Sequence, residues 1–348
     1  MDNLFGKGAE IMARRLTALA LLLCLTLTAC GGGEDSRGQG LFQGAAGVEE
    51  EEILLTVDGR EVPAWRYLYW LRRCCGRLLK QYRAAGLPLD WNAPVEGGTL
   101  ADYARDQALA DTALYATVET WAEEYGCALD EADLAAMEAD WAERTAEYGG
   151  EEAYLRYLAD MGLDRQRVET LNGVGRLYAK LYGLYLEEGG PLAPAPEALQ
   201  AFAAEQGRIT VDRLLFAAGE DRESARQRAA EAFARLNTAE DRQSEFTALA
   251  AAGDDPGGPR TFTLGDGTLD EELEAAARDL EPGQCSGILE TEEGFSILLR
   301  QETDLTGLEE IYFDHLLQAA AEGAEVRLTE TYRALDVPAF AARLAEED

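Results

Sequence analysis

Residues 291–300, TEEGFSILLR, are the stretch that decides how the second half of the chain folds. A turn signal at Glu293-Gly294 is followed by an apolar run, the pattern of a buried strand. A similar run, ITVDRLLF, occupies residues 209–216. Between the two, the sequence predicts helices at 223–236 and 245–252, a strand at 260–264 and a helix at 269–279. We therefore expect a compact α/β segment built around these two strands.

The sequence upstream of this segment has a helical pattern. Between residues 60 and 186, apolar side chains recur at three- and four-residue spacing, as in Leu114, Val118, Trp121 and Tyr125. Asp130 and Asp164 stand where helix caps are expected. We interpret most of these apolar and aromatic residues as core. The run Gly189-Gly190-Pro191 interrupts the pattern and predicts a boundary, followed by a short helix at 196–205.

Two short apolar runs lie near the ends of the chain. Ile53–Val57 reads as a strand that ends at the turn Asp58-Gly59, and residues 324–328 form a second strand after a helix at about 308–321. A strand this short is not stable alone. We predict that the two runs pair, so that the N- and C-terminal segments close into one helical lobe around the α/β segment.

The N-terminal region has the pattern of an export signal. Arg14 and Arg15 precede an apolar run, 16–27, that is too short to span a membrane. The next residues, Leu27-Thr28-Ala29-Cys30, resemble the lipobox of bacterial lipoproteins, which implies a diacylglyceryl group on Cys30 and cleavage just before it. The alternative is a plain secretory signal with a chance cysteine. We expect residues 1–29 to be a signal peptide and residues 30–52, Gly-rich and then acidic, to be a disordered tether.

Charge and cysteine content exclude several classes of function. Acidic residues outnumber basic ones 66 to 31, so no basic stripe is present to neutralise nucleic-acid phosphates. The acids are scattered over helical faces, so we expect no metal site and no cofactor. Two interpretations of the cysteines stay open: a disulfide between Cys127 and either Cys74 or Cys75, or buried free thiols. No Cys-x-x-Cys motif is present to suggest zinc or redox chemistry.

Residues 208–302 resemble the parvulin-type peptidyl-prolyl isomerase domain. The resemblance rests on the order and spacing of several blocks: residues 211–216, 246–250, Gly257-Gly258 with Phe262, 269–273, LEPGQCS at 280–286, and 291–300. The layout of the whole chain resembles the extracytoplasmic foldases of the PrsA and SurA kind. The expected fold class is therefore α+β. A helical chaperone lobe (53–190) is completed by the C-terminal segment (303–348), and the parvulin-like module is inserted in it or appended to it.

The resemblance also implies site residues. Phe262, Leu269 and Leu273 occupy the positions expected to hold the proline ring. The residues at or near the family's catalytic positions are Arg213, Asp255, Thr291 and Ser296. The family usually has a histidine at the positions of Arg213 and Ser296, and this chain has neither.

The replaced histidines change what we expect of the site. We expect the Arg213 guanidinium to form an ion pair with an acid such as Asp255. The only histidine, His315, lies outside the module on a helix and is interpreted as a structural residue. The fold of the module is expected to persist while its activity is weakened or lost.

Three functions compete at this point. The first is a lipid-anchored folding factor on the extracytoplasmic face of the bacterial membrane that binds unfolded secreted polypeptides and isomerises X-Pro bonds. The second is a chaperone in which the parvulin-like module is an inactive scaffold. The third is a solute-binding lipoprotein, which requires two lobes of alternating strands and helices. The helical pattern of residues 60–186 disfavours the third.

Overall fold

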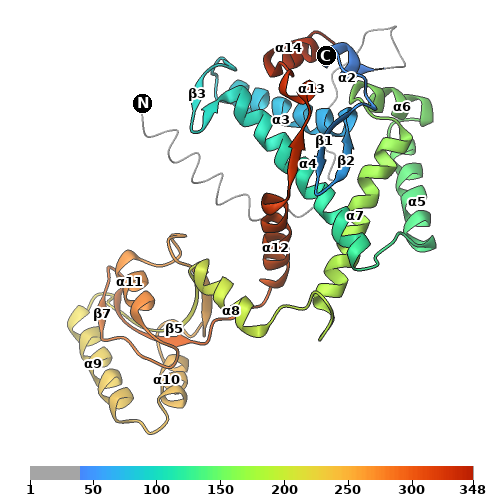
Figure 1. The fold of residues 1–348 in the computed structure, drawn as a ribbon. Coiled ribbons are helices and arrows are strands. Elements are labelled where there is room, and N and C mark those ends of the chain that lie inside the picture. The colour runs from blue at the N-terminus through green and yellow to red at the C-terminus, as the bar shows by residue number, and fades with distance from the viewer. Residues whose placement is uncertain (1–39, 348) are drawn as a thin grey trace. The chain divides into compact units, whose positions relative to one another are not determined.

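The computed structural model describes residues 40–347 (Figure 1). The chain divides into two compact units, one comprising Met1–Ala193 with Phe313–Asp348 and the other Pro194–Tyr312. Helices and small antiparallel sheets together confirm the predicted α+β class. The predicted signal peptide and the predicted lipid attachment site at Cys30 lie outside the described residues. No helix within residues 40–347 is both long enough and apolar enough to cross a bilayer.

The first unit contains a three-stranded antiparallel sheet in the order β2-β1-β9. Its strands are β1 (Ile53–Val57), β2 (Arg60–Pro63) and β9 (Val326–Leu328). The β1–β2 turn places Asp58 and Gly59 at φ 47° and 82°, the left-handed pair that a two-residue hairpin requires. Leu55 lies opposite Leu328 and Val57 opposite Val326. The predicted pairing of the two ends of the chain is therefore confirmed.

Helices make up most of this unit. They are α2 (Leu41–Ala46), α3 (Ala64–Ala84), α4 (Leu100–Glu124), α5 (Glu131–Glu147), α6 (Glu151–Asp160), α7 (Arg165–Leu186), α12 (Glu309–Gly323), α13 (Glu330–Arg333) and α14 (Val337–Glu347), with a small hairpin of β3 (Pro94–Val95) and β4 (Gly98–Thr99) before α4. Asp130 and Asp164 cap α5 and α7 as predicted, since each side chain accepts a backbone N–H of the first turn.

The predicted disordered tether is wrong for residues 40–52. Phe42, on α2, is fully buried, and its ring centroid lies 6.4 Å from that of Phe340 on α14. Arg167 donates to Glu50 and Glu51 at 2.7 and 2.8 Å. The buried Phe42 ring and the ion pairs of Arg167 therefore hold this segment in place. Its glycines and glutamates, taken alone, indicate disorder. Gly162 makes room for the Phe42 ring, which would lie 2.3 Å from a Cβ at that position.

The four cysteines that the structure describes are free thiols. Cys74 and Cys75 are buried on α3, whereas Cys127 and Cys285 are half-buried. Burial raises the pKa of Cys74 to about 11 and that of Cys75 to about 12. Both thiols on α3 are therefore protonated and unreactive at neutral pH, in line with the second of the two interpretations.

The second unit is built on a four-stranded antiparallel sheet in the order β6-β5-β8-β7. Its strands are β5 (Arg208–Ala217), β6 (Arg260–Thr263), β7 (Leu289–Glu290) and β8 (Gly294–Gln301), and its helices are α8 (Pro196–Glu205), α9 (Arg222–Thr238), α10 (Arg242–Ala251) and α11 (Glu271–Asp279). The two apolar runs that dominate the sequence become the central strands. They pair in register from Thr210 opposite Gln301 to Ala217 opposite Gly294.

Each face of this sheet has its own core. Because side chains alternate along a strand, Leu214, Phe216 and Ile297 pack with α9 and α10 on one face. Val211 and Leu298 pack with Leu273 of α11 on the other. A third small cluster joins α8 to the first residues of α12 through Phe202 and Leu308. α11 covers only part of its face of the sheet, and the candidate site lies on the part that remains open.

The structure predicts that the C-terminal helix is needed for the stability of the first unit. Phe340→Ala removes a buried ring that contacts Phe42, and we expect it to lower the free energy of unfolding by about 3–5 kcal/mol. All five tryptophans precede residue 194, so tryptophan fluorescence in urea reports this unit alone. The exposed change Ala342→Ser on the same helix is the control, with an expected cost below about 0.7 kcal/mol. Equal midpoints for the two variants would contradict the prediction.

Candidate functional site

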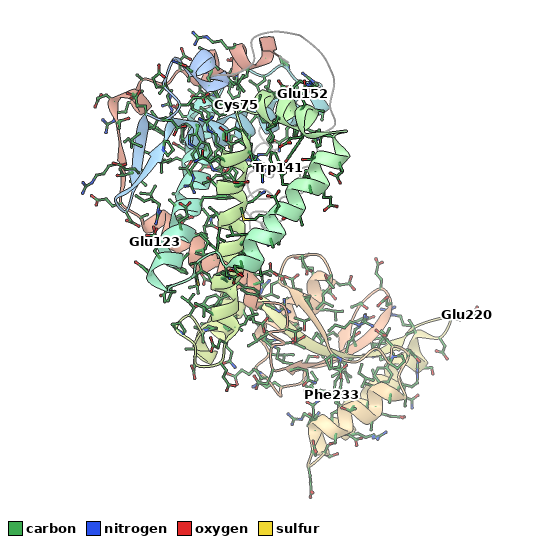
Figure 2. The ribbon with its side chains drawn as sticks, turned by 90° about the vertical axis from the view of Figure 1, so that its right-hand side faces the viewer. Cys75, Glu123, Trp141, Glu152, Glu220 and Phe233 are labelled. Atoms are coloured by element: carbon green, nitrogen blue, oxygen red, sulfur yellow. The ribbon has the colours of Figure 1, made fainter. Side chains whose placement is uncertain are left out.

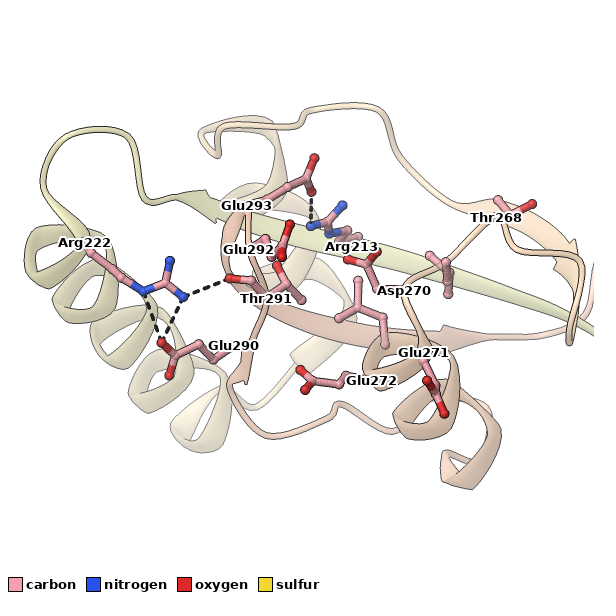
Figure 3. Close-up of a pocket in the computed structure, with 12 residues that line it drawn as sticks. Arg213, Arg222, Thr268, Asp270, Glu271, Glu272, Glu290, Thr291, Glu292 and Glu293 are labelled. Carbon is pink, nitrogen blue, oxygen red and sulfur yellow. Dashed lines mark hydrogen bonds and ion pairs between the residues drawn. The ribbon is translucent and has the colours of Figure 1, made fainter.

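A pocket with a volume of about 890 Å³ lies on the α11 face of the sheet in the second unit (Figure 3). Three parts of the chain surround it: the segment leading into α11, the turn between β7 and β8, and the two arginines Arg213 of β5 and Arg222 of α9. The lining residues are Arg213, Arg222, Thr268, Leu269, Asp270, Glu271, Glu272, Leu273, Glu290, Thr291, Glu292 and Glu293. Of the seven site residues predicted from the sequence, the pocket brings together Arg213, Leu269, Leu273 and Thr291.

Arg213 and Ser296 are neighbours on the central strands. The Arg213 Nε donates to Ser296 Oγ at 3.0 Å, and its Nη2 donates to Glu293 Oε2 at 2.6 Å. Ser296 is fully buried, whereas the Glu293 side chain is 60% exposed. The guanidinium is therefore held in one orientation between a buried hydroxyl and a carboxylate at the rim of the pocket.

The predicted ion pair between Arg213 and Asp255 is wrong. Asp255 binds Arg260 instead, through both carboxylate oxygens at 3.0 and 3.1 Å. The reason is the strand order: β5 lies between β6 and β8, and Asp255 is in the loop that leads into β6. Arg213 turns toward acceptors on the β8 side. Asp255 does not line the pocket.

Thr291 is held by a tight turn at the start of β8. Its backbone N–H donates to the Gly294 carbonyl at 2.8 Å, and its own carbonyl accepts from Arg222 Nη2 at 2.9 Å (Figure 3). Gly294 has φ 150°, and a Cβ there would lie 2.2 Å from the Phe216 carbonyl oxygen, so only glycine fits. The Thr291 side chain is buried, with a hydroxyl that has no partner among the described residues. Because Thr291 lines the pocket, this unsatisfied hydroxyl is a candidate contact for a ligand.

The apolar part of the pocket comes from α11 and the residues before it. Leu273 is fully buried in the core cluster beneath the pocket, and Leu269 packs half-buried against that cluster. Phe262, predicted to contact the proline, is 5% exposed and belongs to the same cluster. It does not reach the pocket lining and supports Leu273 from below.

The charged rim of the pocket was not predicted from the sequence. Six carboxylates and two guanidinium groups line the pocket. Arg222 reaches it from the first residue of α9, and nothing in the sequence places that helix end beside residue 291. The acids were visible as two runs, Asp270-Glu271-Glu272 and Glu290–Glu293, each adjoining a predicted site residue. They were interpreted as surface charge because the whole chain is acidic.

Comparison with protein families identifies this segment. Residues 200–311 match the family described as the PPIC-type PPIase domain. This segment is similar to PPIC-type PPIase domains, and we refer to it below as the PPIase domain. The match confirms the predicted parvulin-type module and extends beyond residues 208–302 at both ends, into α8 and into α12. No group of three or more residues that could hold a metal ion occurs in the part of the chain that the structure describes.

Comparison with solved structures finds foldases of low sequence identity. The PrsA foldase of Streptococcus pneumoniae is 16% identical, with 73% of this chain and 92% of that chain covered and a TM-score of 0.23. PrsA of Bacillus subtilis is 15% identical, with coverage of 85% and 91% and a TM-score of 0.24. A SurA-like chaperone of Campylobacter jejuni is 12% identical, with coverage of 80% and 99% and a TM-score of 0.21. TM-scores this far below 0.5 carry no conclusion about function. No curated protein matches the chain in sequence.

The contact between Arg213 and Ser296 predicts a measurable stability difference within the PPIase domain. Ser296→Ala removes a fully buried acceptor and leaves the Nε of the mostly buried Arg213 side chain unpaired, and we expect a loss of about 1–3 kcal/mol. Hydrogen exchange of peptides covering 208–217 and 294–301, read by mass spectrometry, measures this loss locally. Glu293→Gln weakens an exposed ion pair and is expected to cost less than about 1 kcal/mol. Exchange no faster in Ser296→Ala than in Glu293→Gln would refute the assignment.

Proposed function

We propose that this chain is a lipid-anchored folding factor of the extracytoplasmic space, which binds unfolded polypeptides and isomerises their X-Pro bonds. Two observations support the proposal: the PPIC-type PPIase domain at residues 200–311, and the pocket in which Leu269, Thr291 and Arg213 meet. The lipobox-like residues Leu27–Cys30 support the anchoring and the location. The proposed isomerase activity rests on this pocket.

The reaction needs no nucleophile and no metal. Rotation about an X-Pro bond faces a barrier of about 18–20 kcal/mol that comes from amide resonance. In the twisted transition state that resonance is lost, so the proline nitrogen becomes a better hydrogen-bond acceptor and the carbonyl oxygen carries less negative charge. A site accelerates rotation when it binds this twisted state more tightly than the planar one.

The pocket has the groups for such differential binding. Leu269 and Leu273 provide an apolar wall for the proline ring. The Thr291 hydroxyl has no partner among the described residues, so it can donate to a ligand without first losing another hydrogen bond. The Arg213 guanidinium, oriented by Ser296 and Glu293, adds a fixed positive charge beside it. These three contributions replace the histidine pair expected from the family.

The helical unit supports the client-binding part of the proposal. A pocket of about 320 Å³ between α3, α5, α6 and α7 is lined by apolar and aromatic side chains, including Tyr69, Met137 and Trp141, and by charged side chains such as Asp140 and Arg176. Figure 2 shows Trp141 on the inward side of α5. An apolar pocket with a polar end accepts side chains of an unfolded segment.

One specific observation favours a second candidate, a chaperone without isomerase activity. Arg213 already has two acceptors, Ser296 and Glu293. If these contacts persist when a peptide binds, the guanidinium serves the fold and offers nothing to the proline. Binding of clients by the helical unit would then be the whole function.

Exchange NMR on X-Pro peptides separates the two candidates. We expect catalytic amounts of the full chain to accelerate cis/trans exchange, and Leu269→Trp, which fills the pocket, to reduce the acceleration at least about tenfold, equivalent to about 1.4 kcal/mol of transition-state binding. Ile288→Trp is the control, since Ile288 is exposed and does not line the pocket. Exchange at the buffer rate with wild-type protein would leave only the chaperone.

Suppression of aggregation tests the helical unit independently of the isomerase. We expect Met137→Glu, which places a charge in the aromatic pocket, to raise the amount of full chain needed to keep an unfolded client soluble by about fivefold, the loss of about 1 kcal/mol of binding. Leu87→Glu removes an equally apolar side chain that is 56% exposed outside this pocket, and we expect no effect. Equal activity of the two variants, measured by light scattering, would place client binding elsewhere.

A further inference from the structure

The rim of the PPIase pocket carries an unusual excess of negative charge. Half of its lining residues are acidic, compared with about a fifth of the whole chain. Two of the six acids are neutralised: Glu290 accepts from Arg222 and Glu293 accepts from Arg213. The other four are exposed, and their side-chain carboxylates form no hydrogen bond or ion pair with any described residue: Asp270, Glu271, Glu272 and Glu292.

Helix stabilisation accounts for only part of this charge. Asp270, Glu271 and Glu272 lie at the N-terminus of α11, where acids interact favourably with the helix dipole. Glu292 has no such role, because it lies in the turn between β7 and β8. Glu272 and Glu292 therefore bring negative charge to the pocket from two separate parts of the chain (Figure 3).

The acids surround a site that other observations mark for a ligand. Thr291 lines the pocket and is 8% exposed, and its buried hydroxyl has no partner among the described residues. Leu269 and Leu273 lie on the α11 side, and Leu273 belongs to the apolar core beneath. The pocket therefore combines an apolar part, a buried hydroxyl without a partner in the described part of the chain, and exposed carboxylates at its rim.

We propose that this pocket selects prolines preceded by lysine or arginine, and that Glu272 and Glu292 are specificity-determining residues. The inference rests on the proposed function, because it names the substrate class of the same pocket. Uncompensated carboxylates attract a cationic neighbour of the proline and repel an anionic one. The contribution comes from exposed groups, so it weakens as ionic strength rises.

The test compares peptides that differ only in the residue before proline: lysine, glutamine or glutamate. For each peptide, exchange NMR gives the catalysed rate, and chemical-shift titration of the full chain gives the binding constant at low salt. We expect the lysine peptide to exceed the glutamate peptide by about fivefold to tenfold in binding, and in catalysed rate if the domain is active. Addition of 0.5 M salt is expected to remove most of the difference.

Matched charge variants separate the pocket from the overall charge of the chain. Glu272→Gln with Glu292→Gln is expected to reduce the lysine preference to about twofold or less. The control is Glu231→Gln with Glu240→Gln. Glu231 lies on α9 and Glu240 just after it. Both residues are exposed, and the pair removes the same charge outside the pocket. We expect the control to keep the full preference.

The outcomes distinguish this inference from the proposed function. Equal binding of the three peptides, or equal loss of preference in both double variants, would overturn the charge selectivity even if exchange is accelerated. Selective binding of the lysine peptide without accelerated exchange would support the selectivity and remove the isomerase. Absence of binding by every peptide would overturn the assignment of the pocket itself.

Discussion

The PPIase domain depends on the pairing of β5 with β8. Eight consecutive residue pairs join Thr210–Ala217 to Gly294–Gln301, and both strands contribute side chains to a core cluster on each face of the sheet. The pairing puts Arg213 within reach of Ser296, and it ends where the Gly294 backbone passes too close to Phe216 for any side chain. The turn that holds Thr291 is thereby fixed against the end of β5. The register of one strand pair therefore sets the positions of three groups that line or underlie the pocket.

The first unit depends on a strand pairing between segments that lie much farther apart in the chain, near its two ends. β1 and β9 are separated by the whole PPIase domain, yet Thr329 donates to the Leu54 carbonyl through both its N–H and its hydroxyl. Buried rings on either side, Tyr67 with Tyr332 and Phe42 with Phe340, extend this contact into the helical core. A domain inserted between two such segments has both its ends attached to one unit. Its own two ends, α8 and the start of α12, pack together through a small apolar cluster.

Much of this architecture was predictable from the sequence, and what was not predictable has physical causes. Strand and helix periodicity, with Asp130 and Asp164 as caps, was sufficient for the elements and for the pairing of β1 with β9. The partner of Arg213 was not predictable, because acids in two different loops, Asp255 and Glu293, compete for it and only the strand order decides between them. Residues 40–52 were misread for a related reason. A single buried ring, Phe42, outweighs a composition typical of disorder once its partners on α14 are in place.

Replacing a histidine pair by arginine and serine changes the physical character of the pocket. Histidine titrates near neutral pH and donates or accepts according to its protonation state. Arginine stays charged throughout and only donates, and serine does not ionise in this range. Arg213 and Thr291 line the pocket, and Ser296 accepts a hydrogen bond from Arg213. The Arg213 guanidinium also forms an ion pair with Glu293 on the rim, so the acidic rim and the two residues at the expected histidine positions are joined in one set of contacts.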